Sequence, residues 1–191
     1  MRRAKVYIAL LHYPMRNKNG DAITTSVTNL DLHDIARAAR TYDVDGFWVV
    51  HPAAKQHALI KEIVRYWQEG YGGSYNPDRR EAFARLHIAY TLEEAIASIQ
   101  AQTGRTVLTV ATDAFPHAKT MRCLDLRHRL QEDPQAYLIL FGTGWGMQAE
   151  SLAACDWVLE PIQAVSDYNH LSVRSAVSIF LDRLLGEDWF I

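Results

Sequence analysis

The sequence is short of cysteine, of long apolar runs and of net charge. Its two cysteines, Cys123 and Cys155, lack the C-x-x-C spacing of a zinc or redox site, so we expect two buried thiols rather than a disulfide framework. No stretch approaches the roughly 18 apolar residues that a membrane-spanning helix needs. The formal net charge of −2 excludes a strongly basic, histone-like nucleic-acid binder, although it leaves room for a local basic patch.

The sequence shows neither the pattern expected of a signal peptide nor the common catalytic motifs. After a basic start, its first apolar run is only about seven residues long and ends in His12, Tyr13 and Pro14 rather than in a small-residue cleavage site. We therefore expect a first buried strand and a cytoplasmic protein with no membrane partner. The eight histidines show no HExxH or comparable spacing, which predicts no metal. No GxSxG elbow or Walker loop is present, so hydrolase and kinase functions have no support.

What the sequence contains is an alternation of short apolar runs and amphipathic segments. The apolar runs predict strands at residues 5–11, 46–50, 85–90, 106–112, 137–141 and 157–160. Helical periodicity predicts helices near residues 28–44, 53–69, 92–102 and 119–131, and a last helix that ends at Gly186. The alternation is typical of an α/β fold: a mostly parallel sheet with helices on both faces, here in a single domain of residues 1–191.

Two more detailed predictions concern the region after the second strand. The helix at residues 53–69 should bury Leu59, Ile63, Tyr66 and Trp67, which recur with a helical period. Residues 70–80 are rich in glycine, tyrosine and asparagine and contain paired arginines, so we expect a mobile loop there.

A glycine-rich loop at residues 142–146, GTGWG, follows the apolar run of residues 137–141. In a parallel sheet, ligands bind beyond the carboxyl ends of the strands, so this loop is a candidate ligand site. Its spacing is G-x-G-x-G rather than the G-x-G-x-x-G of dinucleotide-binding proteins, which disfavours a nicotinamide site. A tight glycine loop that lets backbone amides approach a flat adenine or a carboxylate fits better, and a plain strand-to-helix turn is the alternative.

Two further segments are candidates for function. Residues 166–177, SDYNHLSVRSAV, place short polar side chains at the mouth of the last helix, where ligand oxygens can bind; an elaborate helix cap is the alternative. Residues 31–37, DLHDIAR, place Asp34 and Arg37 on neighbouring helix positions with His33 just before them. An ordinary surface ion pair is the alternative for this segment.

Taken in order, these segments resemble the three motifs of the SPOUT class of S-adenosylmethionine-dependent RNA methyltransferases. Residues 31–50 resemble the first motif, residues 138–147 the glycine-rich second motif, and residues 160–180 the third, whose Leu-Ser-Val core opens the last helix. More narrowly, the chain is similar to a small bacterial family of this class over nearly its whole length. The resemblance implies a trefoil knot over approximately residues 106–186, a homodimer, S-adenosylmethionine bound in the knot, and the acceptor nucleotide at the subunit interface.

The resemblance also assigns residues. The cofactor-binding positions it implies are Thr112, Gly142, Gly144, Gly146, Ile162, Leu171 and Ser172. Arg37 matches the motif arginine that activates the acceptor hydroxyl in the ribose-methylating branch, and His33 or Asn169 would assist it. Asp31 and His33 replace the usual Asn and Gly of the first motif, and Trp145 stands where an acidic residue is common. These departures leave open a ribose 2′-hydroxyl or a base nitrogen as the acceptor, in tRNA or in rRNA.

No appended RNA-binding domain is evident, so we expect the domain's own surface to contact the RNA. Candidates for phosphate contacts are Arg16, Lys18, Arg79, Arg80, Arg122 and Arg127. Two other functions remain possible at this point. One is a non-catalytic, knotted RNA-binding or assembly protein, and the other is a nicotinamide-dependent oxidoreductase; binding of S-adenosylmethionine distinguishes them from the methyltransferase.

Overall fold

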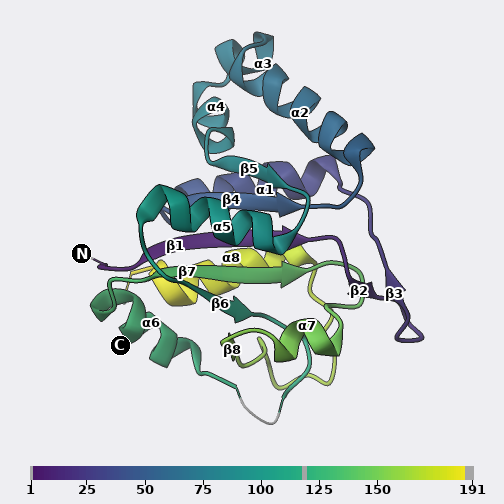
Figure 1. The fold of residues 1–191 in the computed structure, drawn as a ribbon, viewed down its shortest axis with the longest axis vertical. Coiled ribbons are helices and arrows are strands. Elements are labelled where there is room, and N and C mark those ends of the chain that lie inside the picture. The colour runs from purple at the N-terminus through teal and green to yellow at the C-terminus, as the bar shows by residue number, and fades with distance from the viewer. Residues whose placement is uncertain (1, 118–119, 188–191) are drawn as a thin grey trace.

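A six-stranded parallel sheet forms the centre of the protein, as a computed structural model of the chain shows for residues 2–117 and 120–187 (Figure 1). The strands are β1 (Lys5–Leu11), β4 (Gly46–Val50), β5 (Leu86–Ala89), β6 (Val107–Ala111), β7 (Ala136–Gly142) and β8 (Trp157–Val158). Their spatial order is β5-β4-β1-β7-β6-β8, and each neighbouring pair is parallel. The predicted α/β fold with a mostly parallel sheet is confirmed.

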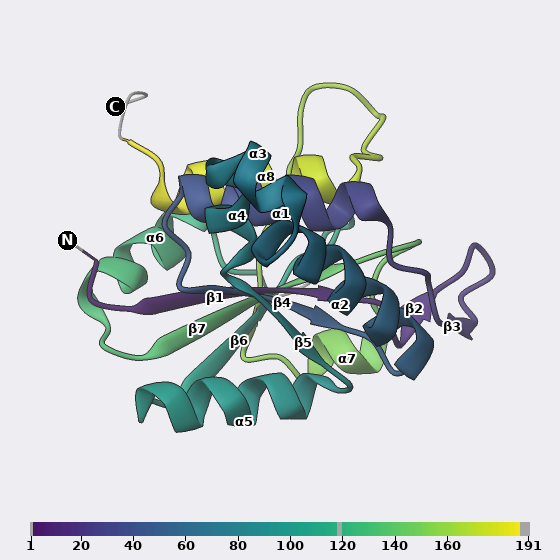
Figure 2. The same ribbon diagram turned by 90° about the horizontal axis from the view of Figure 1, so that it is seen from above.

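Helices cover both faces of this sheet (Figure 2). They are α1 (Asn29–Thr41), α2 (Ala54–Gln68), α3 (Tyr71–Tyr75), α4 (Pro77–Phe83), α5 (Leu92–Thr103), α6 (Cys123–Glu132), α7 (Ala149–Ala153) and α8 (Val173–Leu185). Strand β1 shows the two-sided packing, because its side chains alternate between faces. Ile8 and Leu10 belong to the core cluster that includes α1, α6 and α8, whereas Ala9 and Leu11 belong to the cluster that includes α5 and α7.

The register of the central strands positions the glycine loop. Leu11, the last residue of β1, is opposite Val50 in β4 and Gly142 in β7. The carboxyl ends of these strands therefore meet at one edge of the sheet. Beyond β1, a short antiparallel hairpin, β2 (Met15–Arg16) with β3 (Ala22–Ile23), lies at the same edge (Figure 1).

The segment expected to be a mobile loop is instead folded into α3 and α4. Asn76 caps α4 by accepting a hydrogen bond from the backbone of Arg79, and Pro77 occupies the first turn, where its missing N–H costs nothing. Gly72 and Gly73 let α3 pack directly on α2. The prediction of a loop was wrong because local glycine content cannot show that a helix needs those glycines for close packing.

Two helix predictions also need correction. In α2 the buried residues are His57 and Ile60, whereas Leu59 and Tyr66 are 42% and 49% exposed, so the predicted inner face is rotated. Helix α6 begins at Cys123, and residue 119, where the helix was expected to begin, lies outside the described residues. Within the described part of the chain, no helix is long and apolar enough to cross a membrane.

Candidate cofactor and acceptor site

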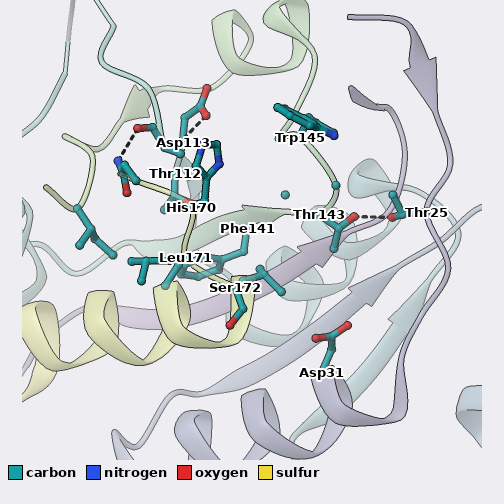
Figure 3. Close-up of a pocket in the computed structure, with 18 of the residues that line it drawn as sticks. Thr25, Asp31, Thr112, Asp113, Phe141, Thr143, Trp145, His170, Leu171 and Ser172 are labelled. Carbon is teal, nitrogen blue, oxygen red and sulfur yellow. Dashed lines mark hydrogen bonds between the residues drawn. The ribbon is translucent and has the colours of Figure 1, made fainter. Parts of the chain in front are cut away.

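A cavity of about 620 Å³ lies where β6, β7 and the start of α8 meet (Figure 3). Its walls come from residues 25–31, 112–115, 141–146, 162 and 169–180, segments far apart in the sequence. All seven residues predicted to contact the cofactor line it: Thr112, Gly142, Gly144, Gly146, Ile162, Leu171 and Ser172. The structure thus brings the second and third sequence motifs together on one cavity.

The glycine loop has a backbone that favours glycine at two positions. Gly144 has φ of +61° and Gly146 has φ of +94°, both in the left-handed region. A Cβ atom on Gly146 would lie 3.0 Å from the Arg16 guanidinium. The loop is also bound to β2, because Trp145 N donates to Arg16 O at 3.2 Å and Arg16 N donates to Gly146 O at 2.8 Å. The β2–β3 hairpin therefore holds the loop from outside.

Two threonines join the wall of the cavity to a buried histidine. The Thr143 hydroxyl donates to Leu11 O at 3.0 Å and is also hydrogen-bonded to the Thr25 hydroxyl, which lies 2.9 Å from His12 Nδ1. A carbonyl oxygen can only accept, so the single hydroxyl proton of Thr143 is donated to Leu11 O. The hydroxyl of Thr25 must therefore be the donor in its bond to Thr143. His12 Nδ1 is then the donor to Thr25. The neutral Nδ1–H tautomer follows, with Nε2 buried and without a partner among the described residues.

A second histidine holds the same segment of the wall, at Thr25. His51 Nε2 donates to Thr25 O at 3.0 Å, and its Nδ1 accepts from Ala53 N at 3.0 Å, which defines the opposite tautomer. Burial, with a smaller contribution from the nearby His51, lowers the pKa of His12 to about 4. Burial also lowers the pKa of His51, against the raising effect of its bond to Thr25. Both histidines are therefore neutral near pH 7.

The opposite wall combines apolar and polar groups. Phe141, Leu171 and Phe180 contribute apolar surface to the cavity. Asn169 is held there by a hydrogen bond from its Nδ2 to Ala114 O at 2.8 Å, and Ser172 caps α8 by accepting from the backbone of Ser175. A flat ring and a polar chain could both be accommodated in such a cavity.

Asp31 brings a carboxylate to the cavity. It lies in the first turn of α1, where its Oδ2 accepts from the Thr28 hydroxyl at 2.6 Å and its backbone N–H donates to Thr28 Oγ1 at 3.2 Å. Arg174 Nε is 3.3 Å from Asp31 Oδ1, and Arg174 Nη1 donates to Asp34 Oδ2 at 3.1 Å. One arginine of α8 therefore orients both carboxylates of α1.

Asp34 and Arg37 line a second, shallower hollow rather than the cavity. Ser172 belongs to both, so the two hollows adjoin at the start of α8. Of the predicted catalytic residues, Asn169 lines the cavity and Arg37 lines the adjoining hollow.

His33 lies elsewhere. Its ring packs edge-on against Trp67 and Phe83, with centroid distances of 5.2 and 4.8 Å, and its Nδ1 is 3.0 Å from Arg79 Nη1. Burial and the positive charge of Arg79 lower its pKa. Of the two residues expected to assist Arg37, Asn169 lines the cavity, and His33 lines neither the cavity nor the adjoining hollow.

Asp113 is a residue of the cavity that sequence reasoning missed. It lies two residues after the end of β6, and its side chain is 2% exposed. It accepts from Arg16 Nη2 at 3.2 Å, His117 Nε2 at 2.9 Å and Ala114 N at 2.7 Å. In Figure 3 it lies at the far side of the view from Asp31. Its place at the carboxyl end of a buried strand is the signal that could have identified it.

The predicted phosphate-binding residues differ in accessibility. Lys18, Arg80 and Arg122 are exposed, and Arg16 is paired with Asp113. Arg79 lies partly buried over the Trp67 ring. The prediction for Arg127 was wrong: it is buried, and its guanidinium donates to Arg183 O at 2.9 Å and Gly186 O at 2.6 Å. It joins α6 to the end of α8 rather than facing a ligand.

A family described as SAM-dependent RNA methyltransferase matches residues 5–186. The chain belongs to this family. The match shows that the chain is an RNA methyltransferase with S-adenosylmethionine as its cofactor, and it argues against a nicotinamide-dependent oxidoreductase. The methyltransferase also has the fold of a SpoU methyltransferase, AviRb from Streptomyces viridochromogenes, whose crystal structure is a complex with AdoMet. That likeness has a TM-score of 0.58 at 15% identity and covers 97% of this chain and 60% of that one.

Two relatives are more similar in sequence. An uncharacterised protein of Aquifex aeolicus is 43% identical over 96% of the methyltransferase and 89% of the relative. A tRNA (guanine-N(1)-)-methyltransferase of Oleidesulfovibrio alaskensis is 40% identical over 95% of the methyltransferase but only 42% of the relative. The chain therefore spans less than half of that second protein, and more than half of it has no counterpart here.

The cavity of the methyltransferase suits S-adenosylmethionine by size and chemistry. Its volume of about 620 Å³ lies within the range usual for small-molecule sites, roughly 300–1,000 Å³. Its lining offers glycine backbone, apolar surface such as Phe141 and Leu171, and polar groups such as Thr112 and Asn169. Among residues 2–117 and 120–187, no group of three or more His, Cys, Asp or Glu side chains is placed to hold a metal ion.

Proposed function

We propose that this protein methylates a base nitrogen of RNA, with S-adenosylmethionine bound in the cavity and the acceptor nucleotide entering from the side of Asp31. One observation carries the proposal: seven residues from separate segments, chosen by their motifs, line one cavity, and a carboxylate lines it with them. The glycine loop and the turn at Leu171 and Ser172 would hold the cofactor, with the backbone of Gly144 and Gly146 approaching it closely.

The chemical demand on the protein is modest. When bound, S-adenosylmethionine supplies a methyl group on a positively charged sulfur that leaves as a neutral thioether. The protein must align the acceptor and accept its proton. Asp31 meets the second need, because its carboxylate lines the cavity and is oriented by Thr28 and Arg174. A carboxylate is a weak base, which suits the relatively acidic N–H of a nucleobase better than a ribose hydroxyl.

Arg37 and Asn169 complete the proposed acceptor site. Arg37 lines the adjoining hollow, where it would contact a phosphate or the acceptor nucleotide. Asn169 is fixed at the cavity by its bond to Ala114 and would orient the acceptor. His33 would have a structural role, because its ring contacts both Arg79 and Phe83. The printed name of the O. alaskensis relative, a guanine N1 methyltransferase of tRNA, agrees with a base nitrogen and suggests tRNA as the RNA class.

The proposal includes an assembly and a topology. The hollow with Asp34 and Arg37 is open and shallow, so a second copy against α1 and α8 would complete it, and we propose a homodimer. We also propose one methyltransferase domain over residues 1–191, with residues 106–186 knotted around the cofactor, and a cytoplasmic location, where its RNA substrate occurs. Sedimentation equilibrium tests the dimer, and tracing the chain in an experimental density map tests the knot.

Cofactor binding and methyl transfer test the function together. We expect titration calorimetry to show binding of S-adenosylmethionine and S-adenosylhomocysteine. Tritiated methyl groups should then pass to bulk RNA from cells that lack the gene, and nucleoside analysis should find the label on a base nitrogen. Absence of cofactor binding would refute the enzyme. Binding without transfer would favour a non-catalytic RNA-binding factor, and label on ribose would reject the role of Asp31 and favour Arg37.

A further inference from the structure

A pair of tyrosines stands exposed on a part of the protein that the cavity does not use. Helices α2, α3 and α4 project from the β5 side of the sheet, and α3 lies far from α7 and the glycine loop before it (Figure 1). On α3, Tyr71 is 71% exposed and Tyr75 is 76% exposed. Their rings are stacked, with centroids 6.0 Å apart and an interplanar angle of 26°. Two large aromatic faces are thus held in water side by side.

The packing of α3 determines this exposure. A Cβ atom on Gly72 would lie 2.5 Å from the Tyr66 ring, and one on Gly73 would overlap the carbonyl oxygen of Trp67. The glycine side of α3 is therefore pressed against α2. Tyr71 and Tyr75, one helical turn apart, share the side that faces away. Two of the five residues of α3 are therefore glycines, and this lets the helix present Tyr71 and Tyr75 outward.

Two arginines lie on α4, the helix that follows α3. Arg80 is exposed, and its Cδ lies 3.3 Å from the position of a Cβ on Gly73, so its side chain reaches α3 at that glycine. Arg79 lies with its guanidinium 5.1 Å from the centre of the Trp67 ring. Of the acidic residues of α4, Glu81 is already paired with Arg40 at 2.7 Å, while Asp78 stays exposed in the first turn.

We propose that Tyr71, Tyr75 and Arg80 form a second RNA-binding surface that stacks unpaired bases of the substrate, away from the cavity. The inference rests on the proposed function, because it takes the partner to be RNA. Unpaired bases stack on exposed aromatic rings whatever their sequence, and a neighbouring arginine binds the phosphate backbone. Such a surface orients a large RNA. A protein partner on the same rings is the competing outcome.

Direct RNA binding by the full-length protein tests the surface without relying on catalysis. The probe is a fluorescein-labelled oligouridylate of about 16 nucleotides, the upper site size of common single-strand binding domains, followed by fluorescence anisotropy. Because stacking on each ring is worth a several-fold change in affinity, the double variant Tyr71→Ala/Tyr75→Ala should bind about 10-fold more weakly or worse. Tyr71→Phe/Tyr75→Phe keeps both rings and should stay within about twofold of the wild type.

Two control variants separate this surface from general effects. Leu59→Ala removes another exposed apolar side chain, on α2, and should leave RNA affinity unchanged. Arg80→Ala should reduce the slope of log K against log salt by about 0.7, whereas Arg3→Ala, at an exposed arginine before β1, should not. Cofactor affinity, measured by calorimetry, should be the same in all variants.

The outcomes decide the proposal. It is overturned if the wild type does not bind the oligouridylate, if the double alanine variant binds as well as the wild type, or if the phenylalanine variant loses as much as the alanine variant. It is also overturned if the alanine variant changes the mass in solution while RNA affinity is kept, because the rings then contact protein. A wild type that binds RNA through these rings but neither binds S-adenosylmethionine nor methylates RNA would refute the proposed function and leave this surface intact.

Discussion

Arg174, in the first turn of α8, lies with its Nε 3.3 Å from the Asp31 carboxylate in the first turn of α1. The contact links the two helix starts that border the cavity, and the same guanidinium bonds Asp34 on the outer side of α1. Asp31 and Asp34 therefore share one cation but line different hollows. Substitutions of the two carboxylates can therefore be compared directly. Both disturb the contact that holds α1 to α8, but only a substitution of Asp31 changes the cavity.

Replacing Asp31 by asparagine should abolish most methyl transfer. The substitution keeps the size of the side chain and its bond to Thr28, but an amide cannot accept a proton from the acceptor. We expect kcat to fall by about 100-fold or more, the usual contribution of a general base, while the affinity for S-adenosylmethionine stays within a few-fold. Asp34→Asn, which disturbs the same arginine, should cost less than about 10-fold. Full activity in Asp31→Asn would exclude the carboxylate as the proton acceptor.

Arg37 should matter for the acceptor but not for the cofactor, because it lines the outer hollow only. Arg37→Ala is expected to lower kcat/KM for RNA by about 10-fold or more, the scale of one lost contact to a charged group, with unchanged cofactor affinity. Arg40→Ala is the matched control, since Arg40 lies one turn further along α1 and is paired with Glu81. An Arg37→Ala protein that methylates RNA at the full rate would remove the proposed role.

The glycine loop offers a test of cofactor binding with a close control. Gly144 and Gly104 have nearly the same φ, +61° and +65°, both in the left-handed region. A Cβ on Gly144 would lie 3.3 Å from both Arg16 O and the Thr25 methyl group, whereas nothing lies within 4 Å of one on Gly104. Both alanine variants should lose about 1 kcal/mol of stability from the strained φ.

Only Gly144→Ala should also weaken S-adenosylmethionine binding, by about 10-fold or more, because its loop forms the cavity wall. Calorimetry on both variants, at a temperature where both are folded, makes the comparison. Equal cofactor affinity in the two proteins would show that the loop does not approach the ligand.

The buried arginine of α6 should be structural. Arg127 donates to the carbonyls of Arg183 and Gly186, which end α8, so Arg127→Ala leaves these acceptors without that cation. We expect the free energy of unfolding to fall by about 2 kcal/mol or more, against less than about 0.5 kcal/mol for Arg122→Ala at the exposed start of the same helix. Urea unfolding measures both. A stable Arg127→Ala protein with weakened RNA binding would restore the original assignment of Arg127 as a phosphate contact.

Arg127 also shows where sequence reasoning stops. The strands could be predicted because strands buried on both faces are continuous apolar runs, and the cavity residues because the motifs at Gly142 and Leu171 are local in sequence. The partners of Arg127 lie 56 and 59 residues away, and the Thr25–Thr143 bond joins residues 118 apart. Periodicity gives the spacing of a helical face but not its direction. The buried face of α2 was therefore misplaced, because it depends on what packs against the helix.

The two neutral histidines behind the cavity wall should make stability depend on pH. The pKa of His12 is lowered to about 4 in the folded protein by burial, from an ordinary value of 6.5, and that of His51 is also lowered. As pH falls below 6.5, His12 binds a proton in the unfolded chain but stays neutral in the folded protein. The free energy of unfolding therefore decreases until the pH reaches the folded pKa. For His12 the loss between about pH 7.5 and 5 is about 2 kcal/mol, and above about pH 7.5 the contribution is nearly constant. His12→Asn removes the titration while its amide can still donate to Thr25. Urea unfolding near pH 7.5 and pH 5 should therefore show a smaller acid-dependent loss in the variant than in the wild type, and equal losses would mean that His12 titrates normally in the folded protein.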